Sequence, residues 1–166
     1  MTPLPTVDEV RMLPATLTTA VEEEFIDENG HMNIRHYVRL EAKGAGVISR
    51  DVGFTSAYRS ERRMSVFTAE HHLKYFAELR LGERISVHPR VLDRSDKTLH
   101  MMALMIDDTN DLLVNTLELV LVHVDLNSRR ATRMPAEITA RIDGYLAEHG
   151  ALPWAPPVTG HMGVRR

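Results

Sequence analysis

The residues best suited to chemistry lie in one short segment, 25–33, with the sequence FIDENGHMN. It places a carboxylate (Asp27), a glycine turn (Gly30) and polar side chains just before the expected start of a helix. The free backbone N–H groups at a helix N-terminus, together with the helix dipole, attract developing negative charge. Such a site suits the oxyanion that forms at a thioester carbonyl. The neighbouring carboxylate could attack that carbonyl or activate a water molecule.

A simpler interpretation is that Asp27 or Asn29 only caps the helix. The other acidic candidates are also open to two readings. Glu70 and Glu118 fall in expected strands, where a glutamate usually lies at a solvated edge. Apolar residues flank Glu118, and if buried it needs partners or a proton. Glu41 falls inside the apolar stripe of the expected helix, where a surface residue should not lie.

The sequence argues against metal and thiol chemistry. With no cysteine, the chain has no disulfide, no cysteine-based zinc site and no cysteine nucleophile. His71 and His72 would point to opposite sides of a strand. His31 and His36 are five residues apart, which misses the i,i+4 spacing of helical ligand pairs. We therefore expect no metal and no other cofactor.

Composition describes an ordinary globular protein of one domain, residues 1–166. The 20 Lys+Arg and 23 Asp+Glu give a net charge of −3, which argues against nucleic acid or a membrane surface as a partner. The N-terminus shows no basic segment followed by an apolar run, and no apolar run approaches the ~20 residues of a membrane span. We expect a cytoplasmic protein.

One amphipathic helix and a series of hairpins must position these residues. A helix is predicted over 33–49, with an apolar stripe on one side and basic residues on the other. Its apolar stripe contains Tyr37, Leu40, Gly44, Val47 and Ile48. Period-two patterns separated by turns then predict antiparallel strands. These strands are expected at 66–76, 85–91, 99–106 and 112–124.

The remaining segments complete the predicted order. A first strand is expected within 16–26, a loop at 55–64 and a last helix at 136–149. Residues 1–15 read as an arm that packs late or not at all, and 151–166 as a tail. The helix stripe has only the sheet to pack against. The sequence thus predicts an α+β fold, in which one long central helix is wrapped by an antiparallel sheet of about five strands, the arrangement of the hotdog fold.

Several segments resemble one family. Residues 27–37, DENGHMNIRHY, resemble the D-x-N-G-H-[MV]-N-x3-Y signature of hotdog-fold acyl-CoA thioesterases related to 4-hydroxybenzoyl-CoA thioesterase. Residues 67–73, 92–100 and 118–125 are similar to three downstream motifs of thioesterase domains associated with L-carnitine dehydrogenase, which hydrolyse betainyl-CoA. The resemblance covers about residues 16–150.

The resemblance implies roles for individual residues. Asp27 would be the catalytic carboxylate, as nucleophile or as general base. His31 and Asn33 would orient the thioester or Asp27, and backbone N–H groups near His31 and Met32 would form the oxyanion hole. Tyr37 would pack under the site. Glu70 would position water or bind substrate, whereas no family role transfers to Glu41.

The substrate and assembly follow from the same resemblance. It implies a homodimer or homotetramer, because the open edge of a five-stranded sheet invites pairing with a second copy. A trimethylammonium acyl group would need aromatic faces or carboxylates, for which Phe67, Tyr75, Glu70 and Glu118 are candidates. An aliphatic or aromatic acyl-CoA is the alternative substrate.

Two other functions remain open on the same fold. A hotdog enoyl-CoA hydratase or dehydratase could use His31 with Glu41, although the hydratase signature is missing. A non-catalytic acyl-CoA-binding protein would need a second module, and residues 1–15 are too short to form one.

Overall fold

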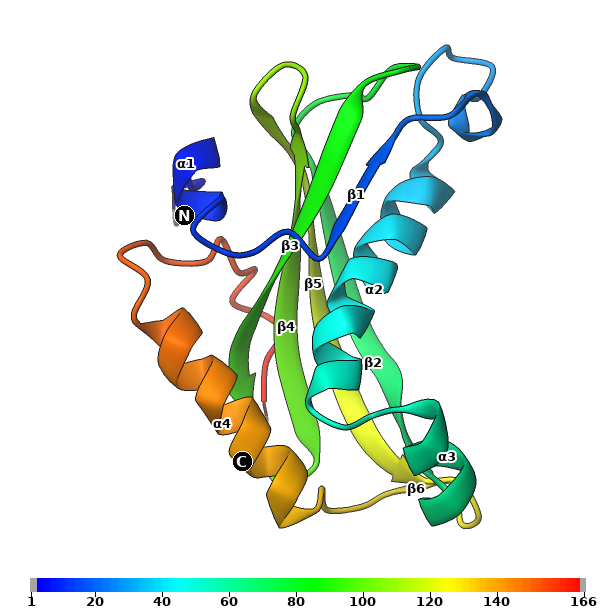
Figure 1. Ribbon diagram of the computed structural model, residues 1–166, viewed down its shortest axis with the longest axis vertical. Helices are drawn as coiled ribbons and strands as arrows, with labels where there is room; N and C mark the ends of the chain where they lie inside the picture. The colour runs from blue at the N-terminus through cyan, green and yellow to red at the C-terminus, as the bar shows by residue number, and fades with distance from the viewer. Residues whose placement is uncertain (1–2, 165–166) are drawn as a thin grey trace.

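The computed structural model describes residues 3–164 and shows a curled antiparallel sheet with one long helix against its inner face (Figure 1). The strands pair in the order β1-β3-β4-β5-β2, and a short β6 pairs with β5. The strands are β1 (Leu17–Ala20), β2 (Met64–Tyr75), β3 (Arg84–Arg94), β4 (Thr98–Asp107), β5 (Leu112–Asp125) and β6 (Arg130–Ala131). The helices are α1 (Val7–Val10), a 3-10 turn (Glu23–Phe25), α2 (Ile34–Asp51), α3 (Ser56–Arg62) and α4 (Ala136–Gly150).

Helix α2 is the predicted central helix. It begins after Asn33, whose side-chain oxygen accepts a hydrogen bond from the Arg35 N–H at 3.2 Å. The helix crosses β3 at Gly44, where a Cβ atom would lie 2.6 Å from Cγ1 of Val87, so only glycine allows this close approach. The residues that α2 buries are His36, Tyr37, Leu40, Glu41, Gly44, Ala45 and Ile48.

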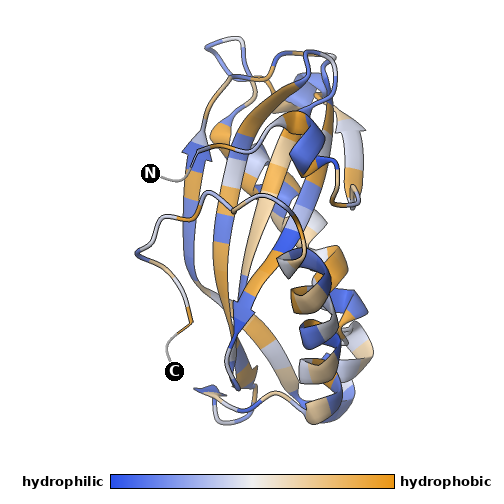
Figure 2. Cartoon of the chain, turned by 90° about the vertical axis from the view of Figure 1, so that its left-hand side faces the viewer, coloured by the Kyte–Doolittle hydropathy of each residue, from blue (hydrophilic) through white to orange (hydrophobic). Residues whose placement is uncertain are grey.

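Successive strand residues point to opposite sides of the sheet, and both faces of β3, β4 and β5 are covered. Figure 2 shows the resulting alternation of polar and apolar residues along the strands. The inner face packs on α2 through Met101, Ala103, Leu117 and Leu119. The outer face packs on the chain termini through Met102, Leu104 and Ile106, which cluster with Val10, Leu13 and Trp154.

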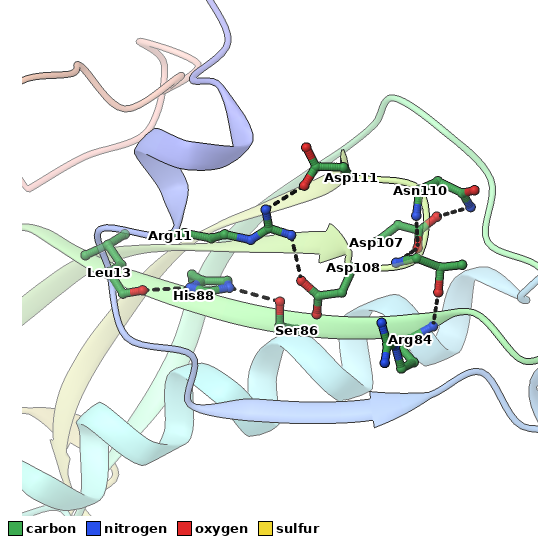
Figure 3. Close-up of polar contacts among 10 residues, drawn as sticks. Arg11, Leu13, Arg84, Ser86, His88, Asp107, Asp108, Asn110 and Asp111 are labelled. Carbon is green, nitrogen blue, oxygen red and sulfur yellow. Dashed lines mark hydrogen bonds and ion pairs between the residues drawn. The ribbon is translucent and has the colours of Figure 1, made fainter.

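The N-terminal segment is packed, which corrects the expectation of a loose arm. The Arg11 guanidinium pairs with Asp108, at 3.1 Å, and with Asp111 in the β4–β5 turn (Figure 3). The carbonyl of Leu13 accepts a hydrogen bond from Nδ1 of His88 at 2.8 Å. Burial lowers the pKa of His88, so this ring favours its neutral form. The segment is therefore anchored to the outer face of the sheet at two points.

The C-terminal segment is also packed, and with α4 it covers one edge of the sheet. The Arg90 guanidinium donates hydrogen bonds to the carbonyls of His149 (2.8 Å) and Trp154 (3.0 Å). The Nδ1 atom of His149 accepts the N–H of Val91 at 2.8 Å, where β3 extends beyond its pairing with β1. At the opposite edge, no strand within residues 3–164 pairs with the outer side of β2. Strand β2 is therefore the open edge.

The element predictions were largely confirmed. The four strands after α2 and the last helix lie where the sequence placed them, within a few residues. The first strand is shorter than predicted, because β1 ends at Ala20 and a 3-10 turn follows. The expected loop at 55–64 contains helix α3, which Thr55 caps by accepting the N–H of Tyr58 at 3.1 Å. Across residues 3–164 no helix has both the length and the apolarity needed to cross a membrane.

Candidate active site

The loop before α2 is a closed turn that fixes Asp27 at the helix N-terminus. The Asp27 N–H donates to the carbonyl of His31 at 3.1 Å, and the Gly30 N–H returns to the carbonyl of Asp27 at 3.0 Å. Gly30 has a φ of +78°, a conformation that favours glycine. The N–H of Asn33 donates to the carbonyl of Phe25 at 2.8 Å, so the turn closes on itself before the helix begins.

Asp27 is held by hydrogen bonds to both of its carboxylate oxygens. Its Oδ1 accepts the backbone N–H of Asn29 at 2.9 Å, and its Oδ2 accepts the side-chain amide of Asn33 at 3.1 Å. The Asn29 N–H is the main cause that lowers the pKa of Asp27, and Asn33 and His31 lower it further. The side chain is 12% exposed. Asp27 is therefore an oriented carboxylate that stays ionised at neutral pH.

Asp27 does not cap α2, which removes the simpler interpretation of this residue. The cap is Asn33, and Asn29 contributes only its backbone N–H to the turn. Nδ1 of His31 lies 3.8 Å from Oδ1 of Asp27 and 3.3 Å from the carbonyl of Met32. The structure thus brings together three of the predicted catalytic residues, Asp27, His31 and Asn33.

The expected oxyanion hole needs one correction. The Met32 N–H donates to the carbonyl of Leu79 at 2.7 Å, so it is not free to bind an oxyanion. The His31 N–H has no acceptor among residues 3–164. It is a free donor near Asp27, at the N-terminus of α2. Leu79 follows Met32 by 47 residues in the sequence, so local spacing could not reveal this hydrogen bond.

An open pocket of about 340 Å³ adjoins this turn. Met32 and Tyr37 line it, as expected for substrate-binding residues, and Tyr75 forms the facing wall. The Tyr37 and Tyr75 rings meet edge to face with centroids 5.1 Å apart. Burial raises the pKa of Tyr37 to about 12, and its hydroxyl accepts the N–H of Leu79 at 3.1 Å. The complete lining is His31, Met32, Ile34, Tyr37, Tyr75, Phe76, Ala77 and Glu78.

The two strand glutamates lie away from this group. Glu118 points to the outer face, where it is 2% exposed, and accepts hydrogen bonds from Nε2 of His100 (2.9 Å) and the N–H of Thr159 (2.8 Å). His72 is the cross-strand partner of Glu118, so Glu70, two residues earlier on β2, shares that outer face. Glu118 is therefore part of the packing under the C-terminal segment. Glu70 is exposed on the edge strand, with its side chain directed away from α2.

Glu41 lies on the inner face, fully buried, on the turn of α2 below Tyr37. A larger hollow of about 740 Å³ lies between the β3–β4 turn and α4, lined by residues such as Arg94 and Asp143. None of the motif residues before α2 lines it, so the site is assigned to the smaller pocket, which His31 and Met32 line.

Comparison with known proteins places these features in a family. Residues 21–142 match the model of the thioesterase-like superfamily. A betainyl-CoA thioesterase of Pseudomonas aeruginosa is 30% identical over 139 residues, which cover 83% of this chain and 87% of that protein. An L-carnitine dehydrogenase/betainyl-CoA thioesterase of Rhizobium meliloti is 28% identical over 149 residues, 89% of this chain. The chain spans only 30% of that longer relative.

Solved structures share the fold. A Staphylococcus aureus protein solved in complex with CoA superposes with a TM-score of 0.81, at 24% identity, over 93% of this chain and 97% of that one. A thioesterase of Thermus thermophilus complexed with coenzyme A and Zn gives a TM-score of 0.64, at 20% identity, over 78% of this chain and 98% of that one. These likenesses confirm the predicted hotdog architecture.

Proposed function

This chain is a hotdog-fold member of the thioesterase-like superfamily, and we propose that it hydrolyses a small acyl-CoA to the free acid and CoA, with Asp27 as the catalytic carboxylate. The observation that carries the proposal is the Asp27 carboxylate, held by the Asn29 N–H and the Asn33 amide. It lies 3.8 Å from Nδ1 of His31, a residue that lines the open pocket at the N-terminus of α2. Its depressed pKa keeps it ionised, and so ready to act, at neutral pH.

Two routes are compatible with this geometry. Asp27 can attack the thioester carbon, expel the CoA thiolate and form a mixed anhydride that water hydrolyses. Alternatively, it removes a proton from a water molecule while that water attacks the carbon. In both routes the negative carbonyl oxygen would be stabilised by the His31 N–H and the N-terminus of α2. Single turnover in ¹⁸O water separates the routes, because label enters Asp27 only through the anhydride.

For the acyl group we propose a short cationic one, as in betainyl-CoA. The relatives from Pseudomonas aeruginosa and Rhizobium meliloti carry that name, and the former matches this chain over most of its length. The pocket supports the assignment, since tyrosine side chains line it and Lys and Arg are missing from its lining. The reaction would belong to carnitine breakdown in the cytoplasm.

A second copy of the chain completes the proposed assembly. The six residues 67–72 of β2 are all exposed, and the outer edge of this strand is unpaired. Exposed apolar side chains continue along this edge and the adjoining pocket: Ile34, Phe67, Tyr75 and Phe76. Edge-to-edge pairing of β2 in a homodimer would cover them. Because the terminal segments cover the outer face of the sheet, the edge of β2 is the favoured dimer interface. A homotetramer would need a further contact surface.

The experiment is a panel of acyl-CoA substrates assayed for free thiol, containing betainyl-, acetyl-, octanoyl- and 4-hydroxybenzoyl-CoA. We expect thiol release with at least one substrate and, for the cationic assignment, a kcat/KM for betainyl-CoA at least tenfold above acetyl-CoA, or ~1.4 kcal/mol. Release with another acyl group would move the substrate assignment and leave the hydrolase assignment intact. Absence of release from the whole panel would count against the function.

A further inference from the structure

A hollow of about 400 Å³ lies along the C-terminal half of α2, at the end of the molecule where α2, α3 and β2 come together (Figure 1). We call it the α2 hollow. Arg50, in the last turn of α2, and Arg59, on α3, both line it, and so do Ser56 and Thr68. No acidic residue among 3–164 lines it. Guanidinium and hydroxyl groups without a carboxylate suit an anionic ligand.

Both arginines of the α2 hollow keep their charge available. Neither forms an ion pair with a carboxylate in residues 3–164. Arg62, three residues after Arg59 on α3, instead pairs with Glu137 at 2.7 Å. Gly46 leaves room for Arg50, because a Cβ atom at position 46 would lie 3.3 Å from its Nη1 atom. The Arg50 guanidinium therefore lies back over α2, against a wall of the hollow that Gly46 also lines.

Further cations on α2 lead along the helix to this hollow. At about 100° per residue they fall on one stripe, opposite the buried side of the helix. The stripe consists of Arg35, Arg39, Lys43 and Arg50, which are all exposed. No acidic residue of α2 shares it. Like charges four residues apart destabilise a helix, as at Arg35, Arg39 and Lys43. Breaking a local rule in this way is typical of a functional surface.

The homodimer proposed above brings the α2 hollow next to the active site of the other copy. In a two-fold dimer the two β2 strands pair edge to edge and run antiparallel. The Met64 end of one strand then lies beside the Tyr75 end of the other. Val66 and Thr68 line the hollow near the first end, whereas Tyr75 lines the pocket at the N-terminus of α2. The cationic stripe is on the solvent side of α2, so strand pairing does not cover it.

We propose that the α2 hollow and its cationic stripe bind the phosphate groups of CoA, and so select thioesters of CoA over those of a shorter carrier. The inference rests on the proposed thioesterase function and names the residues that recognise the carrier. CoA has its phosphates at one end of the pantetheine arm and the thioester at the other. Arg50 and Arg59 hold the phosphates, and the arm delivers the thioester to Asp27 of the partner subunit. Binding energy gained far from the reacting carbon thereby positions the carbonyl.

The first test measures binding and does not depend on turnover. Free CoA, 3′-dephospho-CoA and pantetheine are each titrated calorimetrically into the wild type, into Arg50→Gln/Arg59→Gln and into Lys97→Gln. Lys97→Gln is the matched control, because it removes an exposed cation that lines the larger hollow at the β3–β4 turn. Thermal denaturation checks that each variant is folded.

We expect the wild type to bind CoA at least tenfold more tightly than pantetheine, with 3′-dephospho-CoA between them. Arg50→Gln/Arg59→Gln should lose roughly tenfold or more in affinity for CoA and keep its affinity for pantetheine, since only phosphate contacts are removed. Added salt should weaken CoA binding by the wild type more than by this variant. Lys97→Gln should bind all three compounds as the wild type does.

The second test asks which copy supplies the arginines. Asp27→Asn and Arg50→Gln/Arg59→Gln are co-expressed with different affinity tags, and the mixed dimer is purified and assayed with the best acyl-CoA of the panel. If the hollow serves the partner's site, one site of the mixed dimer has both Asp27 and the two arginines. The activity should then be about half that of the wild type, well above that of either variant alone.

Each other outcome has a separate meaning. Equal binding of CoA and pantetheine by the wild type overturns the phosphate subsite and leaves the thioesterase function standing. The same holds if Arg50→Gln/Arg59→Gln binds CoA normally, or if only Lys97→Gln loses it. A mixed dimer no more active than its component variants overturns delivery to the partner subunit. CoA binding that depends on Arg50 and Arg59, in a protein that hydrolyses no acyl-CoA, supports the subsite and overturns the function.

Discussion

Asn33 connects the start of α2 to Asp27 with the two ends of one amide group. Its Oδ1 atom accepts the Arg35 N–H at 3.2 Å and so caps the helix, while its Nδ2 atom donates to Oδ2 of Asp27 at 3.1 Å. The same side chain therefore stabilises the helix and orients the carboxylate. This arrangement ties the position of Asp27 to the helix N-terminus that would stabilise an oxyanion.

Replacement of Asp27 should remove most of the activity without unfolding the protein. Asp27→Asn keeps the size of the side chain but can neither attack a carbonyl nor accept a proton, so kcat should fall ~10²–10⁴-fold. The measurement is steady-state thiol release, with thermal denaturation as the check on folding. Asp143→Asn, on the exposed side of α4, is the matched control and should keep full activity. Normal turnover by Asp27→Asn would rule out the proposed role.

Asn33→Ser should separate the two roles of Asn33. Serine is as good a helix cap as asparagine, so the midpoint of thermal unfolding should stay within a few degrees of the wild type. Serine has no amide to reach Asp27, so kcat should fall roughly tenfold, as expected for the loss of one hydrogen bond to a charged group. If Asn33→Ser lowered the midpoint of thermal unfolding together with kcat, Asn33 would act only as a helix cap.

The pH dependence of Asn33→Ser gives an independent reading of the same contact. In the wild type the Asn33 amide helps to lower the pKa of Asp27, so its removal should raise that pKa. Activity requires the ionised carboxylate, and the acidic limb of the kcat/KM profile should therefore move to higher pH. A limb that stays in place, or moves to lower pH, would contradict the assigned contact.

The sequence predicted the central helix and the strands well, because apolar residues recur about every 3.6 positions in a helix and every second position in a strand. It also predicted that Asp27, His31, Asn33, Met32 and Tyr37 lie close together, since all belong to one loop and the first turn of the helix that follows it. The orientation of Glu118 was less accessible. Strand β5 is apolar on both faces because the packed termini cover its outer side, so alternation could not show which face met α2.

Non-local contacts account for the other differences. The Met32 N–H is occupied by a carbonyl from the segment after β2, which no local pattern shows. The packing of residues 3–15 depends on Arg11 reaching the β4–β5 turn, although the capping box Thr6–Glu9 was a local signal for α1. Tyr75 was a candidate only for its aromatic ring, because its contact with Tyr37 joins β2 to α2 across 38 residues and no local pattern shows it.

The open edge of β2 predicts a dimer that one substitution can weaken. The pairing of β2 with β5 skips Ala69, which lies in a bulge between Thr68 and Glu70. Proline is tolerated at bulges but blocks pairing along an edge, so Ala69→Pro should leave the fold intact and weaken association. Analytical ultracentrifugation should give about twice the 18.8 kDa chain mass for the wild type and a lower mass for Ala69→Pro. Ala69→Ser should remain dimeric, and a monomeric wild type would contradict the proposed assembly.

Glu41 should lower the stability of the protein increasingly as pH rises. Its pKa in the folded state is raised well above the usual 4.5. Below pH 4.5 Glu41 is protonated in both the folded and the unfolded state, so its ionisation does not change the stability. As pH rises above 4.5 the unfolded chain ionises while the folded protein keeps its proton, so stability falls by at most ~1.4 kcal/mol per pH unit. Glu41→Gln and Glu41→Leu abolish this loss. Their free energies of unfolding in urea should exceed that of the wild type by an amount that grows as pH rises above 4.5.

Glu78→Gln is the control with the opposite sign. Arg80 lowers the pKa of Glu78, so its contribution to stability is present at neutral pH and disappears as pH falls through the folded-state value. Glu78→Gln should therefore have a lower free energy of unfolding than the wild type at neutral pH, and this loss should shrink toward acidic pH. Glu41→Gln should instead have a higher free energy of unfolding at neutral pH, and this gain should shrink toward acidic pH. A difference for Glu41→Gln that is the same at every pH would mean that Glu41 titrates alike in both states, and that its burial has no electrostatic cost.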